Sequence, residues 1–259
     1  MNLNDLSTQL LFTTVPIWVR KAQGTVTGTG FIYNVPVPDD PARSIPLLIT
    51  NFHVVEGALD GVIELVERSG DQPLLQKRVR AQIDATVLHA RTDSRLDIAL
   101  IPLGPLLNQL DSSGRPVFFR SIGPEIVPAF DVVSELAAVE EIVFIGYPSG
   151  LRDEHNSMPL VRRGITASPV WNDFGNDPVF LIDAGVYPGS SGSPVFIMNQ
   201  GSYATKGGLV VGTRLWFLGV ITSTMLRTEA TGNAYLGLGR VVKSSAVKNA
   251  IDLFAASLK

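Results

Sequence analysis

Cysteine is absent from the 259 residues of this sequence, and histidine occurs only three times. The absence of cysteine excludes disulfides, thiolate metal sites and a cysteine nucleophile, although it does not determine the cellular compartment. With only three histidines, a histidine-rich metal site is not available either. We therefore expect the protein to work without a metal or another cofactor.

The sequence also lacks an excess of one charge and a long apolar run. Its formal net charge is −3, so no overall field attracts nucleic acid or an anionic membrane, and we expect neither as a partner. The first basic residues, Arg20 and Lys21, follow the first apolar stretch, whereas a secretion signal carries them before it. The charge-free span Ala184–Thr205 is rich in glycine, serine and proline, which is not typical of a membrane helix. By default we predict a cytoplasmic protein.

The composition is that of a well-packed protein with many turns. Hydrophobic residues make up 45% of the chain and charged residues 17%, with 24 glycines and 17 prolines. Short β-rich runs alternate with turn clusters, which is typical of a sandwich or a barrel. The predicted strands of the first part are Thr14–Arg20, Thr25–Val35, Leu47–Thr50, Gly61–Glu67, Lys77–His89 and Asp97–Ile101. Those of the second half are Ile142–Gly146, Leu160–Ala167, Val179–Asp183, Val195–Met198, Gly208–Thr222 and Tyr235–Val242.

Three other stretches break this alternation. Pro36–Pro46 is rich in proline and aspartate and is predicted as a loop. Pro102–Leu136 shows no sustained period and is predicted to connect two β-rich halves, with some strand in Val117–Arg120. The C-terminal segment changes to a helical period and predicts an amphipathic helix packed on the second half. The apolar face of this helix carries Val247, Ala250, Ile251, Phe254 and Leu258.

The most informative stretch reads GVYPGSSGSPVF, from Gly185 to Phe196, and places Ser191 between two apolar runs. Glycines two residues before and one residue after this serine allow a tight turn in which backbone N–H groups point inward. Acyl-transfer chemistry needs such a turn, because the nucleophile must lie beside amide donors for an oxyanion. Serine, glycine and proline between strands also form ordinary turns, so this stretch alone leaves both interpretations open.

Two further stretches suggest partners for this serine. His53 lies in LLITNFHVVEGA, just after an apolar run, and Asp97 lies in RLDIALIPL, where it opens another. Taken singly, each could be an ordinary residue at a strand end or a turn. Together with Ser191 they give the order His, Asp, Ser, in which a general base lies near the nucleophile and an acid holds the base from behind.

With these motifs in order, the sequence resembles the chymotrypsin-fold serine proteases, in particular the HtrA-like bacterial trypsin-like peptidases. The resemblance covers roughly Thr25 to Phe254. GTGFIYN is similar to the strand that opens the first barrel, TNFHVVEGA to the histidine motif and LDIALI to the aspartate motif. IGYPSG and LVRRGITASPV resemble the segments that lead to the active-site loop. IDAGVYPGSSGSPVF resembles the nucleophile motif, LGVITST the strand beside the specificity pocket, and GLGRVVKSSAVKNAIDLF the last strand and closing helix.

This resemblance implies an all-β fold of two six-stranded antiparallel β-barrels with a C-terminal α-helix. Residues 1–118 are expected to form the N-terminal barrel, which carries His53 and Asp97. Residues 119–259 are expected to form the C-terminal barrel, which carries Ser191 and the helix. No PDZ-like domain is expected after the helix.

The resemblance also implies roles for individual residues. Ser191 is the expected nucleophile, His53 the general base and acid, and Asp97 the carboxylate that orients the imidazole. The backbone N–H groups of Gly189 and Ser191 are expected to form the oxyanion hole. Thr222, Ser223 and Thr224 are expected to pair with the backbone of a polypeptide substrate as an added antiparallel strand, and the Thr222 hydroxyl to support the aspartate.

The sequence departs from the family pattern at several of its motif positions. Ser190 stands where trypsin-like zymogens have an aspartate that pairs with a new N-terminus, so activation by that route is not expected. Ser193 gives a GSP ending similar to that of the glutamyl endopeptidases, but Val220-Ile221-Thr222 lacks their histidine. Gly185, expected to line the pocket, stands where trypsin-like enzymes keep an acidic floor. A small or medium uncharged residue is therefore expected at P1, the substrate residue before the cleaved bond.

Other catalytic architectures fit the sequence less well than a serine endopeptidase does. An α/β-hydrolase needs a glycine at position 193 and a histidine after the serine, and no histidine follows His155. The subtilisin order would need Asp39 or Asp40, which lie in the Pro-rich stretch. A latent or inactive binding or scaffold module on the same fold stays open, because fold does not fix function. Activity that depends on a regulatory protein partner also stays open, and the sequence does not indicate an oligomeric state.

Overall fold

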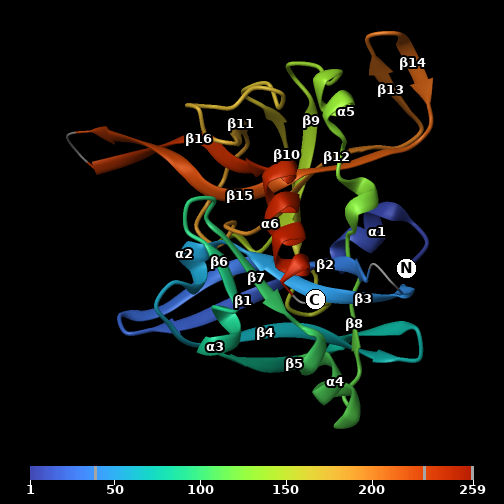
Figure 1. The fold of residues 1–259 in the computed structure, drawn as a ribbon, viewed down its shortest axis with the longest axis vertical. Coiled ribbons are helices and arrows are strands. Elements are labelled where there is room, and N and C mark those ends of the chain that lie inside the picture. Colours follow the sequence, from blue (N-terminus) through green and yellow to red (C-terminus); the bar gives the residue numbers. More distant parts are fainter. Residues whose placement is uncertain (38–39, 230–231, 258–259) are drawn as a thin grey trace.

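A computed structural model describes residues 1–37, 40–229 and 232–257 of the chain. Most of the structure is β-strand, arranged in one large sheet and one closed barrel (Figure 1). The elements of the first part are α1 (Leu6–Leu11), β1 (Thr14–Lys21), β2 (Gly24–Val37), β3 (Asp40–Thr50), α2 (Phe52–Val55), β4 (Ala58–Ser69), β5 (Gln72–Asp84), α3 (Ala85–Leu88), β6 (Arg91–Asp93), β7 (Ile98–Pro102), α4 (Gly104–Ser112) and β8 (Val117–Phe118).

The elements of the second part follow a short connecting region. They are the 3₁₀-helix η1 (Pro124–Ile126), α5 (Phe130–Ser134), β9 (Glu141–Gly146), the 3₁₀-helix η2 (Pro148–Gly150), β10 (Leu160–Thr166), β11 (Val179–Asp183), β12 (Pro194–Asn199), β13 (Ser202–Thr205), β14 (Gly208–Val211), β15 (Arg214–Glu229), β16 (Gly232–Lys243) and α6 (Ser244–Ala256). The closed barrel runs β10-β11-β16-β15-β12-β9, so the prediction of a six-stranded barrel is confirmed for this half. The short hairpin β13-β14 projects from it (Figure 1).

The prediction of a second closed barrel is not met by the described strands. The first half is an eight-stranded sheet in the order β5-β4-β1-β2-β3-β7-β6, with β8 paired to β4. Helix α3 comes between β5 and β6, and its Leu88 is fully buried against β4, where a Cβ on Gly61 would lie 3.1 Å from Leu88 Cδ1. In the described part of the chain no pairing joins the edge strands β5 and β6, so the sheet is not shown as a closed barrel. The predicted domain boundary between residues 118 and 119 stays a prediction.

Two local predictions were wrong, one for a predicted loop that is paired and one for a predicted strand that ends early. Pro36–Pro46, predicted as a loop, is part of the β2-β3 hairpin, in which Val35 lies opposite Ile45, although residues 38 and 39 lie outside the described part. Proline lacks an N–H but fits a strand where no ladder hydrogen bond is needed. The predicted strand Lys77–His89 ends at Asp84, and α3 follows.

The closing helix α6 lies across the boundary between the sheet and the barrel (Figure 1). Its buried residues include Val247, Ile251 and Phe254, as the helical period predicts, and Ala250 is partly buried against the same core. The last predicted position, Leu258, lies outside the described residues. The buried residues of α6 join a core cluster that contains Phe31 from β2 and Phe217 from β15, whose ring centroids are 5.4 Å apart. Because residues from both halves share this core, the helix ties the sheet to the barrel.

In the described part of the chain, no helix has the length and apolarity to span a membrane.

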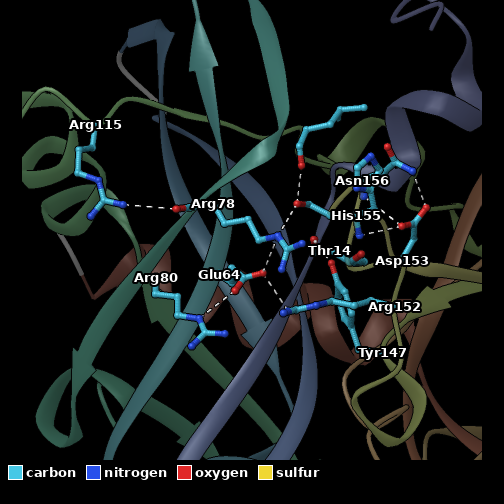
Figure 2. Close-up of polar contacts among 12 residues, drawn as sticks. Thr14, Glu64, Arg78, Arg80, Arg115, Tyr147, Arg152, Asp153, His155 and Asn156 are labelled. Atoms are coloured by element: carbon cyan, nitrogen blue, oxygen red, sulfur yellow. Dashed lines mark hydrogen bonds and ion pairs between the residues drawn. The ribbon is translucent and has the colours of Figure 1, made fainter.

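A buried carboxylate on β4 gathers three arginines on the face of the first sheet (Figure 2). Glu64 is 6% exposed, and its carboxylate lies 3.0 Å from Nε of Arg80, directly across the strand pair. It also lies 2.9 Å from Nη1 of Arg152, whose side chain is 6% exposed and stacks on Trp18 at 5.2 Å. Arg78 approaches the same carboxylate at 3.8 Å. Glu64 therefore compensates cations that come from β5 and from the loop after η2.

This arrangement predicts a large stability loss when the carboxylate is neutralised. Glu64→Gln leaves the buried Arg152 guanidinium without its counter-charge, so we expect the free energy of unfolding to fall by about 3–5 kcal/mol. The matched control is Glu141→Gln, because the Glu141–Arg163 pair is 69% and 71% exposed. An exposed pair is worth at most about 1 kcal/mol. Chemical denaturation of both variants measures the difference, and equal losses would contradict the assignment.

Candidate active site

The structure brings His53 and Asp97 into direct contact at one end of the first sheet. His53 lies in the short helix α2, and its Nδ1 is 2.8 Å from Oδ2 of Asp97. The backbone N–H of His53 donates to the other carboxylate oxygen at 2.9 Å. Because an ionised carboxylate only accepts hydrogen bonds, Nδ1 of a neutral imidazole must carry the proton, which leaves the lone pair on Nε2. The aspartate therefore sets both the tautomer and the orientation of the ring.

Asp97 is held in place by its own backbone conformation and by a neighbour that sequence reasoning missed. Its φ of +57° lies in the left-handed region, which aspartate adopts more readily than most residues. The side-chain amide of Asn51, a fully buried residue, donates to the Asp97 carbonyl oxygen at 2.9 Å. The signal that could have indicated Asn51 is a lone amide in the TNFH stretch, directly after an apolar strand.

Ser191 lies in the loop between β11 and β12, on the barrel side of the site. Its Oγ donates to the carbonyl oxygen of Thr222 at 3.2 Å, and in the described part of the chain no hydrogen bond joins it to His53. Both residues line one cavity of about 530 Å³, to which the first sheet and the barrel contribute. The serine and the imidazole thus face the same space, with the hydroxyl turned toward β15.

Two backbone N–H groups beside Ser191 have no acceptor among the described residues. They belong to Gly189 and Ser191, whereas the N–H of Ser190 between them donates to the Tyr187 carbonyl at 3.0 Å. The positive φ values of Gly189 (+86°) and Gly192 (+88°) produce this turn. These two groups are the ones that the resemblance predicts for the oxyanion hole, and unpaired donors on one loop are what such a hole requires.

The strand β15 presents an open edge to the cavity. β12 pairs with β15 only as far as Val220, so that edge is free of a strand partner at Thr222–Thr224, and all three residues line the cavity. An extended peptide can add to such an edge through main-chain hydrogen bonds. The predicted role of the Thr222 hydroxyl needs correction. This hydroxyl donates to the Arg240 carbonyl at 3.5 Å and does not support Asp97. The shift in strand register next to Thr222 turns its side chain toward β16.

Gly185 does not line the cavity, although the neighbouring residues Val186 to Pro188 do. The guanidinium of Arg162, from β10, donates to the Gly185 carbonyl, and a Cβ on Gly185 would lie 2.8 Å from Nη2 of Arg162. The same guanidinium stacks on Tyr187 at 5.0 Å and on Phe144 at 5.5 Å. No ion pair joins it to a carboxylate within the described ranges. A cation therefore lies behind the segment that the resemblance assigns to the primary pocket.

Other charged side chains line the cavity beyond those that the sequence indicated. Arg240 pairs with Asp177 at 2.5 Å, and both residues reach the cavity with Arg95. Nothing in the local sequence around these residues predicts that they meet.

Among the described residues, no group of three or more histidine, aspartate or glutamate side chains could hold a metal ion.

Comparison with known proteins adds independent findings to this geometry. The sequence matches the family of trypsin-like peptidase domains over residues 28–203, a range that contains His53, Asp97 and Ser191. No curated protein matches the sequence. Among solved structures, the fold is similar to the HtrA-type protease AlgW with a tripeptide, at a TM-score of 0.51 and 16% identity over 93% of this chain. It is also similar to the serine endoprotease from Yersinia pestis, at a TM-score of 0.52 and 15% identity over 99% of this chain.

The matched proteins are longer than this chain. The alignment covers 60% of the AlgW chain and 67% of the Yersinia pestis chain. At identities of 15–16% these structural matches show the fold alone.

The turn around Ser191 predicts that Gly192 cannot carry a side chain. A Cβ there would overlap the carbonyl oxygen of Thr29, in addition to the strain of about 1–2 kcal/mol that a positive φ imposes. We expect Gly192→Ala to lower the free energy of unfolding by at least about 3 kcal/mol, since overpacking adds about 1–3 kcal/mol. Gly57→Ala is the control, because Gly57 has a φ of +66° but nothing within 4 Å of its Cβ position. Similar unfolding free energies for the two variants would contradict this packing.

Proposed function

Because the chain belongs to the family of trypsin-like peptidase domains, we propose that it is a serine endopeptidase that hydrolyses polypeptides through an acyl-enzyme intermediate. Ser191 is the nucleophile, His53 the general base and acid, and Asp97 the carboxylate that orients the imidazole. The observation that carries the proposal is the convergence on one cavity of a paired histidine and aspartate and a serine, with two unpaired amides on the loop of that serine.

Acylation follows from the positions of these groups. The Asp97 carboxylate holds the proton on Nδ1, so Nε2 of His53 can take the proton of the Ser191 hydroxyl as the serine oxygen attacks the substrate carbonyl. The developing oxyanion enters the recess formed by the N–H groups of Gly189 and Ser191. The imidazolium then gives its proton to the leaving amine. Water repeats the sequence in the second half of the reaction and releases the acid product with a free serine.

The hydrogen bond between Ser191 and Thr222 links substrate binding to this chemistry. The Thr222 carbonyl, which accepts the serine hydroxyl at 3.2 Å, lies on the open edge of β15. A peptide that adds to this edge presents its own N–H groups to the strand. When a substrate N–H donates to the Thr222 carbonyl in place of the serine hydroxyl, that hydroxyl is free to rotate about the Cα–Cβ bond of Ser191 toward His53. Hydrogen bonds in such sites commonly tighten only once substrate is bound.

The primary pocket selects a small or medium uncharged side chain at P1. Val186, which lines the cavity, is 4% exposed, and no carboxylate of the described residues pairs with the Arg162 guanidinium behind Gly185. Asp177, which lines the cavity, pairs with Arg240 and is not free to receive lysine or arginine at P1. The Arg162 guanidinium behind Gly185 also disfavours these residues, because bringing a like charge close to it is costly.

The alternative, a latent or inactive binding module, is disfavoured by two observations. The two recess amides are free of protein acceptors, so the loop is not collapsed onto its own carbonyl groups. The His53–Asp97 pair is also formed, at 2.8 Å. A regulatory protein partner and a cytoplasmic location stay predictions.

A fluorophosphonate probe tests the nucleophile. We expect it to label the wild-type protein covalently at Ser191 and to leave Ser191→Ala unlabelled, as read by mass spectrometry of the labelled peptide. Ser190→Ala is the matched control, because the neighbouring Ser190 hydroxyl is buried and has no hydrogen-bond partner among the described residues. A folded wild-type protein that resists the probe, or a labelled Ser191→Ala, would overturn the proposal.

A peptide-library digest tests the pocket. We expect cleavage after small or medium uncharged residues, with at least a tenfold lower kcat/KM for peptides that differ only by lysine or arginine at P1. That ratio corresponds to about 1.4 kcal/mol between the two transition states. Ser191→Ala, digested in parallel, removes cleavage by contaminating proteases from the profile. Preferred cleavage after lysine or arginine would refute the assigned pocket.

A further inference from the structure

The amide recess beside Ser191 consists of peptide units whose carbonyl groups are anchored from behind. In a trans peptide the C=O and N–H groups point in opposite directions. The carbonyl of Pro188 accepts from the N–H of Ser149 at 2.6 Å, which turns the Gly189 N–H the other way. The carbonyl of Ser190 accepts from the N–H of Ser193 at 3.0 Å, which does the same for the N–H of Ser191. The hydrogen bonds to these carbonyl groups therefore keep the two amides directed into the recess.

The peptide between these two units is anchored by Thr29, a fully buried residue of β2. Its Oγ1 donates to the Gly189 carbonyl at 2.9 Å and accepts from the N–H of Tyr147 at 3.0 Å. Its backbone N–H donates to the carbonyl of Ser191 at 2.9 Å. A hydroxyl has one donor and two acceptor positions, so this side chain satisfies the nucleophile loop and the Tyr147 segment at the same time.

We propose that Thr29 is a positioning residue whose hydroxyl keeps the amide recess beside Ser191 in the conformation that can receive an oxyanion. This inference rests on the proposed peptidase function. Removing the hydroxyl leaves the buried Gly189 carbonyl and the buried Tyr147 N–H without a partner, and such groups are costly to leave unpaired. Rotation of the peptide units around Gly189 relieves that cost and turns the recess amides away from the cavity.

The strand β2 can reach the loop because three positions around Thr29 leave room. The pairing of β2 with β3 begins at Phe31, so the same edge of β2 is open at Thr29. On the barrel side, Gly146 faces the hydroxyl, and a Cβ there would lie 2.7 Å from Thr29 Oγ1. Gly192 faces the Thr29 carbonyl, which also accepts from Thr50 Oγ1 at 2.8 Å. The two halves of the molecule therefore touch backbone to backbone at this point.

The segment whose Tyr147 N–H donates to the Thr29 hydroxyl is itself fixed at both ends. Tyr147, at its start, donates its phenol proton to the Thr14 carbonyl at 3.2 Å, and burial raises the pKa of this phenol, so it stays a neutral donor. Arg152, at its end, pairs with Glu64 (Figure 2). Between them, Ser149 has a φ of +51°, which directs its N–H at the Pro188 carbonyl. A single hydroxyl thus joins a rigid turn to the nucleophile loop.

The side chain of Ser190, next to the nucleophile, does not hold the amide recess in place. Ser190 is 1% exposed, and its hydroxyl has no hydrogen-bond partner in the described part of the chain. The loop therefore depends on contacts from β2 and from the Tyr147 segment for its conformation. Of these contacts, the Thr29 hydroxyl is the one that a side-chain substitution can remove cleanly.

Thr29→Ser and Thr29→Ala isolate the hydroxyl, because both lack the γ-methyl group and they differ only in that oxygen. The experiment measures covalent labelling of Ser191 by a fluorophosphonate probe over a range of probe concentrations, which separates the maximal rate kinact from the half-saturating concentration KI. We expect Thr29→Ser to keep kinact within threefold of wild type. We expect Thr29→Ala to lose at least tenfold in kinact at an unchanged KI, since loss of one full oxyanion donor costs about 100- to 1,000-fold.

The control is Thr27→Ala, the same exchange on the same strand at a hydroxyl without a hydrogen bond in the described residues, and it should leave kinact unchanged. Melting curves of all variants set an assay temperature at which each is folded, so that a loss of kinact does not report unfolding. A kinact of Thr29→Ala within tenfold of wild type, a Thr29→Ser variant that loses as much kinact as Thr29→Ala, or an effect on KI alone overturns the inference and leaves the peptidase function standing. A wild-type protein that the probe does not label overturns the proposed function as well.

Discussion

The hydrogen bonds of Thr29 connect the two halves of this protein at the point where its proposed chemistry takes place. His53 and Asp97 belong to the first sheet, whereas Ser191 and the recess amides belong to a loop of the barrel. For these groups to act on one substrate carbonyl, the two halves must keep a fixed separation. Thr29 meets this need through its hydroxyl and its N–H, which bond to the barrel half, while its carbonyl accepts from Thr50 within the first sheet. The shared aromatic core around Phe31 and Phe217 adds apolar packing to the same boundary.

The rest of the site follows from this boundary. The open edge of β15 lies on the same cavity as the imidazole, so a peptide bound there would reach both halves at once. Further from the cavity, the Glu64–Arg152 pair holds the segment that supports the recess. A buried ion pair of this kind adds less to net stability than its charge suggests, because desolvation opposes the attraction. Its geometric effect, which fixes where the segment lies, is therefore the more important one.

The pattern of correct and incorrect expectations has a physical origin. The strands β9 to β12 and the helix α6 carry strong apolar periods and were predicted, whereas the predicted strand Gly208–Thr222 is two strands, β14 and β15. The β2-β3 hairpin was predicted only in part, because the prolines and aspartates of Pro36–Pro46 are typical of a loop although the backbone there is paired. The resemblance implies a closed barrel for the first half, whereas the described strands form a sheet in which no pairing joins the edge strands β5 and β6. Whether a sheet closes depends on long-range packing, which a local pattern does not record.

The sequence by itself determined which residues could carry the chemistry, because a serine between glycines, a histidine after an apolar run and an aspartate before another are local patterns. Only the tertiary structure decided how these residues are supported. Thr29 and Gly189 are 160 residues apart, and Tyr147 is 118 residues from Thr29. Arg162 reaches Gly185 from another strand, and Asn51 reaches Asp97 from another loop. Contacts of this kind leave no periodic or local trace, since they form only when segments far apart in the sequence are brought together by the fold.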